Sequence, residues 1–173
     1  MHLLILACVL LPLLGFLLIS FSPQHQEHRI AAISLWMTRL KGLAVLGLLT
    51  TWALNGFKNY EYQWLVLYQH DEYQFPLLFF LDRVGATYLF VVWAIFSAIM
   101  KYCRVYLHRE AGYKRFFQAI FGFAFGLNLI VLSGSIDMLF VGWEIVGISS
   151  FLLIAFYRHR PQPVRNALRA YTV

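Results

Sequence analysis

Charged residues are scarce in this sequence, and their scarcity excludes most soluble folds. Asp, Glu, Lys and Arg make up 13% of the 173 residues, whereas 61% are hydrophobic. An ordinary soluble domain is about a quarter charged and about half apolar. A water-soluble fold could not cover this much apolar surface, so the composition predicts a single membrane domain.

Cysteine and the motifs of common catalytic sites are also scarce. The two cysteines, Cys8 and Cys103, lie in apolar stretches far apart in the chain, which predicts two free thiols near opposite faces of the membrane. The sequence has no phosphate-binding loop, nucleophile elbow, haem motif or metal-ligand cluster. We therefore expect no redox site, no metal and no cofactor on this chain. The net charge of +6 comes from basic residues at the ends of apolar runs, which indicates membrane orientation and not nucleic-acid binding.

Five apolar runs have the length of roughly 20 residues that a helix needs to cross the hydrocarbon layer. The predicted fold is an all-α integral membrane protein with transmembrane helices at about 3–21, 37–54, 84–105, 116–132 and 136–157. The first run lacks a basic start and a cleavage site, so we expect it to be retained and not removed as a signal peptide. We expect an amphipathic helical tail at 158–173, and we take residues 1–173 as one domain.

The link between the second and third spans is aromatic and amphipathic. Strand-like pieces at Gln63–Tyr68 and Gln74–Phe80 flank a turn-prone segment at Gln69–Glu72. Tyrosines and Trp64 favour the headgroup layer of a bilayer. This pattern predicts an interfacial hairpin.

Charges alternate from one link to the next. The link before span two, the link between spans three and four, and the tail are basic, whereas the other two links are mainly acidic. Basic loops remain in the cytoplasm. The pattern therefore predicts a bacterial-type inner membrane protein with its N-terminus outside and its tail in the cytoplasm.

Two cations, Arg39 and Lys41, interrupt the second apolar run. A charge in mid-membrane costs about 2.5 to 3.5 kcal/mol on insertion scales. The favoured interpretation is that the helix begins near Met37 and that both side chains extend to the inner interface. The alternative is that one of them faces a polar channel.

Glu144 is the principal candidate for a functional residue. It falls eight residues into the fifth span, about 12 Å deep at 1.5 Å per residue, and its carboxylate cannot reach either headgroup layer. Such acids face a bundle interior or a water-filled path and commonly carry protons. The alternative is a protonated Glu144 that serves packing through a hydrogen bond to a neighbouring helix.

Other polar residues of the spans receive lesser roles. Asp137, at the start of span five, suits a helix N-terminus and is expected to cap it, although it is kept as a secondary site candidate with Lys41 and Arg39. Asn128 and Ser97 could line a path, but single residues of this kind usually form interhelical hydrogen bonds. We assign neither to a site.

The stretch Leu139–Tyr157, with its core Gly-Trp-Glu-x-Val-Gly, resembles the fifth-helix signature of the antiporter-like subunits of respiratory NADH:quinone oxidoreductase, in the branch of subunit L (mitochondrial subunit 5). Gly112-Tyr113-x-Arg115-Phe116-Phe117 and Leu81-Asp82 also look like that branch, so the resemblance runs from about residue 75 to the end. It implies a divergent N-terminal part of a larger proton-translocating subunit, in which Glu144 carries protons and pairs with a lysine on a later helix. It also implies partner membrane subunits that supply the later helices and the driving reaction.

Two segments depart from the pattern of that branch. Gly134-Ser135 replaces its usual Asp-Asn, and Asp82-Arg83-Val84-Gly85 replaces its usual Asp-Gly-Leu-Ser. Similar proteins work in multisubunit cation/proton antiporters and in inorganic-carbon uptake systems, so a component of such a system is one alternative. A structural membrane scaffold is the other.

Overall fold

The computed structural model describes residues 1–70, 73–158 and 160–172. In chain order its elements are α1 (His2–Ser20), α2 (Glu27–Leu54), β1 (Tyr60–His70), β2 (Tyr73–Leu81), α3 (Arg83–Tyr106), α4 (Tyr113–Val131), α5 (Ile136–Ile154) and α6 (Pro161–Thr172). Within the described residues, α1 to α5 are long and apolar enough to cross a membrane. The predicted class, an all-α multi-pass membrane protein, is confirmed.

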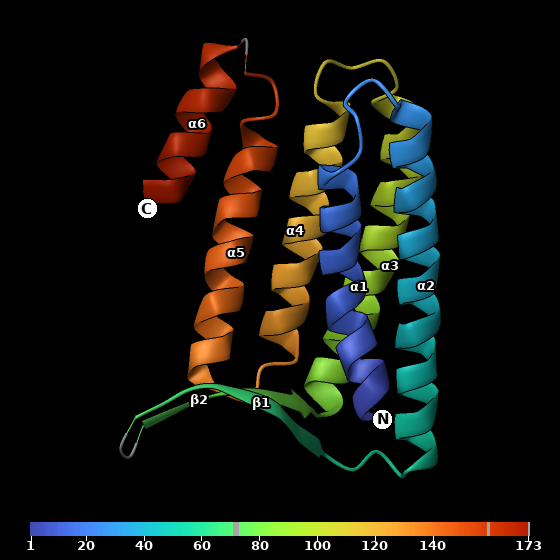
Figure 1. Cartoon of the computed structure of the whole chain (residues 1–173), viewed down its shortest axis with the longest axis vertical. Helices are drawn as coiled ribbons and strands as arrows, with labels where there is room; N and C mark the ends of the chain where they lie inside the picture. Colours follow the sequence, from blue (N-terminus) through green and yellow to red (C-terminus); the bar gives the residue numbers. More distant parts are fainter. Residues whose placement is uncertain (71–72, 159, 173) are drawn as a thin grey trace.

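Helices α1 to α5 form a bundle in which α5 and α2 occupy opposite edges, and α6 lies outside α5 (Figure 1). α4 and α1 lie between these edges, and α3, which lies behind them in this view, packs against α2 and α4. α6 folds back beside α5, where the rings of Phe151 and Tyr171 lie 5.6 Å apart. Two buried apolar clusters, one toward each end of the bundle, hold α1 to α4 together.

A two-stranded antiparallel hairpin crosses one end of the bundle and extends past α5 (Figure 1). It is longer than the predicted strands, and the predicted turn residues Asp71 and Glu72 lie outside the described part of the chain. Backbone hydrogen bonds tie β2 to the α4–α5 connection, from Phe80 N to Leu132 O at 2.9 Å and from Gly134 N to Leu78 O at 2.7 Å. The hairpin therefore fixes the point at which α5 begins.

Charges divide between the two ends of the bundle. We call the end with the hairpin the hairpin end; it carries Lys58, Glu61, Asp82, Arg83 and Asp137. We call the other the basic end; its helix ends and loops carry Arg29, Lys101, Arg104, Arg109, Lys114, Arg115, Arg158 and Arg160. The free thiols of Cys8 and Cys103 lie toward the hairpin end and the basic end, respectively.

The predicted start of the second span was wrong. α2 begins at Glu27 and not near Met37, because no proline or glycine interrupts the chain between these residues and an unbroken helix satisfies its own backbone in an apolar medium. The helix is 28 residues long. Lys41 therefore lies near the middle of α2 along its length.

Candidate functional site on helix α5

The start of α5 is set by Ser135 and not by the residue predicted to cap it. The Ser135 hydroxyl accepts a hydrogen bond from the backbone N–H of Met138 at 3.3 Å. Asp137 lies in the first turn, where its charge suits the positive end of the helix dipole. The sequence signal that was missed is a serine directly before the first helical residue, which is a preferred N-cap residue.

α5 packs against α4 through two glycines. A Cβ atom on Gly126 would lie 2.9 Å from the backbone oxygen of Gly142, and a Cβ atom on Gly142 would lie 3.0 Å from the backbone oxygen of Gly126. Gly142 therefore marks the face of α5 that contacts α4. Small residues at this point let the two backbones approach closely.

Glu144 points away from that contact. It follows Gly142 by two residues, which turns its side chain about 200° around the helix. We expected an intramembrane acid to face a bundle interior or a water-filled path. The side chain of Glu144 is instead exposed in this chain and does not face the interior of α1 to α4. No hydrogen bond or ion pair to its carboxylate occurs among the described residues.

The carboxylate instead borders a cavity between α5 and α6. The cavity has a volume of about 430 Å³ and is lined by Trp143, Glu144, Gly147, Ser150, Phe151, Ala170 and Tyr171. Nothing lies within 4 Å of a Cβ atom built on Gly147, so the surface beside Glu144 is open. A second polar group could approach the acid from this side without displacing α4.

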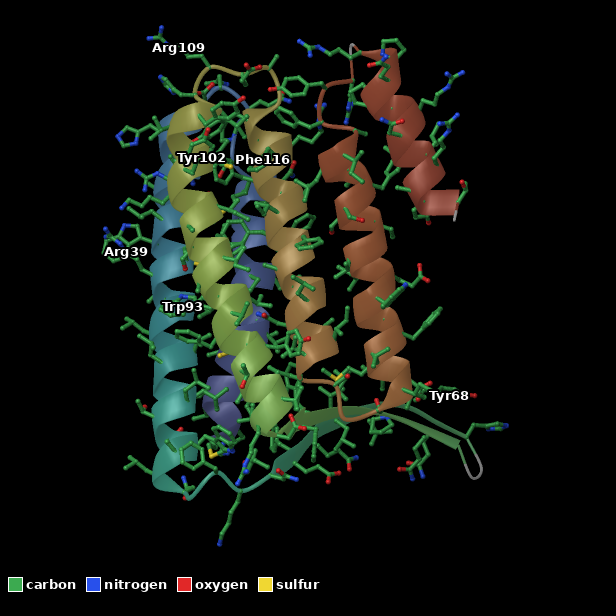
Figure 2. The ribbon with its side chains drawn as sticks, turned by 180° about the vertical axis from the view of Figure 1, so that it is seen from behind. Arg39, Tyr68, Trp93, Tyr102, Arg109 and Phe116 are labelled. Atoms are coloured by element: carbon green, nitrogen blue, oxygen red, sulfur yellow. The ribbon has the colours of Figure 1, made fainter. Side chains whose placement is uncertain are left out.

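The secondary candidates on α2 do not join Glu144, because α2 lies at the opposite edge of the bundle (Figure 1). Arg39 points outward from α2 (Figure 2), and its guanidinium lies 5.7 Å from the ring centre of Trp36. Lys41 is buried, with 1% of its surface exposed. The prediction that Lys41 extends to the interface was wrong, since it lies fourteen residues from Glu27 and about 20 Å from either end of α2.

Two residues that we left unassigned lie inside the bundle. Asn128 on α4 donates a hydrogen bond from Nδ2 to the backbone oxygen of Cys8 on α1 at 2.6 Å, which is the interhelical bond expected of such a residue. Ser97 on α3 has a buried hydroxyl without a hydrogen-bond partner in the described part of the chain. Among the described residues, no group of three His, Cys, Asp or Glu side chains is placed to hold a metal ion.

Comparison with known proteins supports the resemblance seen in the sequence. The chain is 31% identical over 177 residues to NADH-quinone oxidoreductase subunit L of Neisseria meningitidis serogroup A, and the match covers 97% of this chain and 25% of that protein. It is 29% identical to the same subunit of Escherichia coli K12, with 95% of this chain and 27% of that protein covered. It is also 29% identical to a probable K(+)/H(+) antiporter subunit of Rhizobium meliloti, with 95% and 16% covered.

No protein-family profile matches the chain. The relatives nevertheless extend the resemblance from the predicted region after residue 75 to nearly the whole chain. The chain spans about a quarter of the length of the oxidoreductase subunits that it matches. The chain is thus similar over nearly its whole length, at about 30% identity, to subunits of an NADH-quinone oxidoreductase and of a probable K(+)/H(+) antiporter.

Proposed function

We propose that this chain forms the N-terminal membrane part of a proton-translocating subunit in an NADH:quinone oxidoreductase-type assembly, with Glu144 as an intramembrane proton carrier. The observation that carries the proposal is the position of Glu144, a carboxylic acid eight residues into α5 that borders a cavity. Acids at such depth commonly serve proton relays, and the relatives are subunits of such an oxidoreductase.

The open face of α5 supports a role for further protein around Glu144. An unpaired carboxylate facing lipid is costly, whereas one that faces a polar group across a packed interface is stable. We propose that later helices of the same subunit, or a partner membrane subunit, cover this face and supply a cation to Glu144. The cavity between α5 and α6 leaves room for such a side chain.

The driving reaction belongs to partner subunits in this proposal. The chain itself would bind no cofactor and would contribute proton-carrying groups within the lipid bilayer. We further propose that the basic end faces the cytoplasm and the hairpin end faces outward, because basic links are retained on the cytoplasmic side. The N-terminus would then lie outside and α6 on the cytoplasmic side.

A cation/proton antiporter is the second candidate. The similarity to a probable K(+)/H(+) antiporter protein favours it. In that case the chain would exchange protons for a cation in a multisubunit antiporter, and Glu144 would still carry the proton. The two candidates differ in the reaction that accompanies proton movement, which is quinone reduction in one and cation flux in the other.

The test is Glu144→Gln in the assembled complex reconstituted in liposomes. Gln retains the size and one hydrogen-bonding oxygen but cannot titrate, so proton uptake coupled to the driving reaction should be lost. Glu110→Gln, at an exposed acid in the α3–α4 loop, is the matched control and should leave uptake unchanged. Full coupled uptake in the Glu144 variant would favour a structural scaffold instead.

A further inference from the structure

Lys41 is a buried cation on α2. Its Nζ atom has no hydrogen-bond partner among the described residues and lies 4.8 Å from the ring centre of Phe96 on α3. Cys8 on α1 is the titratable side chain that interacts with it electrostatically. The titratable residues of α4 lie in its first turn, at the basic end, well away from this level. A buried ammonium group in this setting needs water or another acceptor.

The buried residues on the interior face of α2 include polar ones on one side of Lys41 and are apolar on the other. Toward the basic end the buried residues include Ser34 and Thr38, which precede Lys41 by about two turns and one turn, respectively. Toward the hairpin end the buried residues are apolar, as in Val45 and Leu48. Polar groups therefore line this face on one side of Lys41.

The hydroxyls of that face retain accepting capacity. Ser34 donates to the backbone oxygen of Ile30, and Thr38 donates to the backbone oxygen of Ser34, both at 2.7 Å. Each hydroxyl oxygen keeps lone pairs that can accept from water or from an ammonium group. Because each hydroxyl donates its hydrogen to the helix backbone, the oxygens of Ser34 and Thr38 remain available as acceptors on the side of Lys41 nearer the basic end.

α3 presents polar atoms to the same region. The Trp93 indole nitrogen lies against Gly42, since a Cβ atom on that glycine would be 2.7 Å from it, and Figure 2 places Trp93 at the α2–α3 boundary. Ser97 and Arg104 follow Trp93 by one and three turns, on the same face of α3. Trp93 Nε1, Ser97 Oγ and Arg104 Nε are all buried without hydrogen-bond partners in the described part of the chain.

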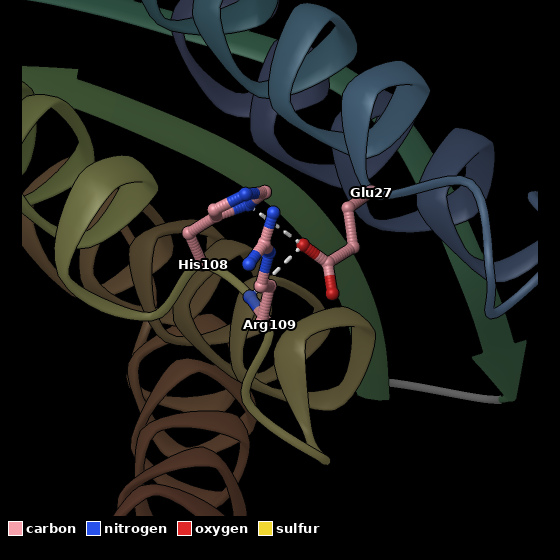
Figure 3. Close-up of polar contacts among 3 residues, drawn as sticks. All are labelled: Glu27, His108 and Arg109. Carbon is pink, nitrogen blue, oxygen red and sulfur yellow. Dashed lines mark hydrogen bonds and ion pairs between the residues drawn. The ribbon is translucent and has the colours of Figure 1, made fainter.

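α2 and α3 run in opposite directions (Figure 1), and Trp93 meets α2 at Gly42. Residues that follow Trp93 on α3 and residues that precede Lys41 on α2 therefore both lie nearer to the basic end. There Glu27 Oε2 lies 3.0 Å from His108 Nδ1 and accepts a hydrogen bond from the backbone N–H of Arg109 at 3.1 Å (Figure 3). A cavity of about 630 Å³ opens beside this cluster, lined by His25, Gln26, Glu27, His28, Arg29, Ala32, His108 and Arg109.

We propose that α2 and α3 enclose a hydrated half-path from the basic end to Lys41, and that Lys41 exchanges a proton with water in this path. The step is a simple transfer, in which the ammonium N–H bond breaks, its proton passes to a water molecule, and the neutral amine later takes a proton back. This inference rests on the proposed function in that protons cross the assembled complex. It adds a second carrier, at the opposite edge of the bundle from Glu144.

Access to the half-path is tested by cysteine labelling in the assembled complex. With Cys8 and Cys103 replaced by serine, Thr38→Cys and Ser97→Cys should react with a small cationic methanethiosulfonate added from the basic end. Val45→Cys, on the same face of α2 but one turn beyond Lys41, should not react. Absence of labelling at both Thr38→Cys and Ser97→Cys, with Lys41 intact, would overturn the proposal.

The role of Lys41 is tested by Lys41→Met in the same complex, with Arg39→Met as the matched control. Arg39 is a cation two residues away on the outer face of α2. Coupled proton uptake should fall about tenfold or more in the Lys41 variant and change less than about twofold in the Arg39 variant, because only the buried group can exchange protons inside the bundle. Normal uptake in Lys41→Met, in a complex that Glu144→Gln inactivates, would overturn the proposal and leave the proposed function intact. If the wild-type complex takes up no protons, the proposed function fails, and the labelling result alone decides whether the half-path exists.

Discussion

Gly126 on α4 and Gly142 on α5 contact each other backbone to backbone, so that neither position has room for a side chain. We expect Gly142→Ala to destabilise the protein by about 1 to 3 kcal/mol, as overpacking of a tight contact does. Gly147→Ala, about one and a half turns along the same helix, meets open space and should stabilise the protein by up to about 1 kcal/mol, because alanine favours a helix over glycine.

Thermal unfolding of the purified protein in detergent measures both variants. Equal effects at the two glycines would mean that helix propensity, and not the α4–α5 contact, controls stability here. The contact bears on the proposed role of Glu144, because it sets the rotation of α5 and therefore the direction in which this side chain points.

The depth of Glu144 in α5 could be predicted from the sequence, but the direction of its side chain could not. Depth follows from counting residues along an apolar run, whereas the face that a residue occupies depends on where the neighbouring helix packs. The sequence signal for that face was Gly142, a small residue two positions earlier. Gly142 could be assigned to the face that contacts α4 only once the structure placed Gly126 opposite it.

On α2, the sequence did not predict the burial of Lys41. The insertion cost of a cation argued for placing Lys41 at the interface, because that cost is assigned residue by residue. In the fold, the surroundings of Lys41 include α3, which lies more than forty residues along the chain and contributes Phe96. The predictions for the first, third and fifth spans and for the hairpin depended on local hydropathy and turn chemistry, and α1, α3, α5 and the two strands occur in those parts of the chain.

Lys114 joins the start of α4 to the end of α1. Its Nζ atom donates hydrogen bonds to the backbone oxygens of Ser20 and Ser22, each at 2.8 Å. Hydrogen bonds from charged groups contribute about 1.5 to 3 kcal/mol, and partial exposure reduces this, so Lys114→Met should cost about 2 kcal/mol. Lys101→Met, at an exposed lysine of the same end, is the control. Equal melting temperatures for the two variants in detergent would contradict the prediction.

Accessibility labelling checks the proposed orientation in intact cells. In a variant without native cysteines, Lys58→Cys at the hairpin end should react with a membrane-impermeant thiol reagent added outside. Glu110→Cys at the basic end should react only after the membrane is permeabilised. Both positions are exposed, so neither result depends on burial. Labelling of both from the outside would contradict the orientation that the basic links predict.

The final prediction concerns the reach of the Glu144 carboxylate. Glu144→Asp keeps a titrating group but withdraws it by one methylene from the cavity between α5 and α6. If the acid relays protons to a group across that cavity, the longer gap slows transfer, so coupled uptake in Glu144→Asp should lie between that of the wild type and that of Glu144→Gln. A group that serves packing alone would rank the variants differently, because Gln preserves the volume of Glu and Asp does not. Proton uptake per turnover, measured for the three proteins in one liposome preparation, distinguishes the two rankings. A Gln variant as active as the wild type beside an impaired Asp variant would show that Glu144 acts through its size and not through its proton.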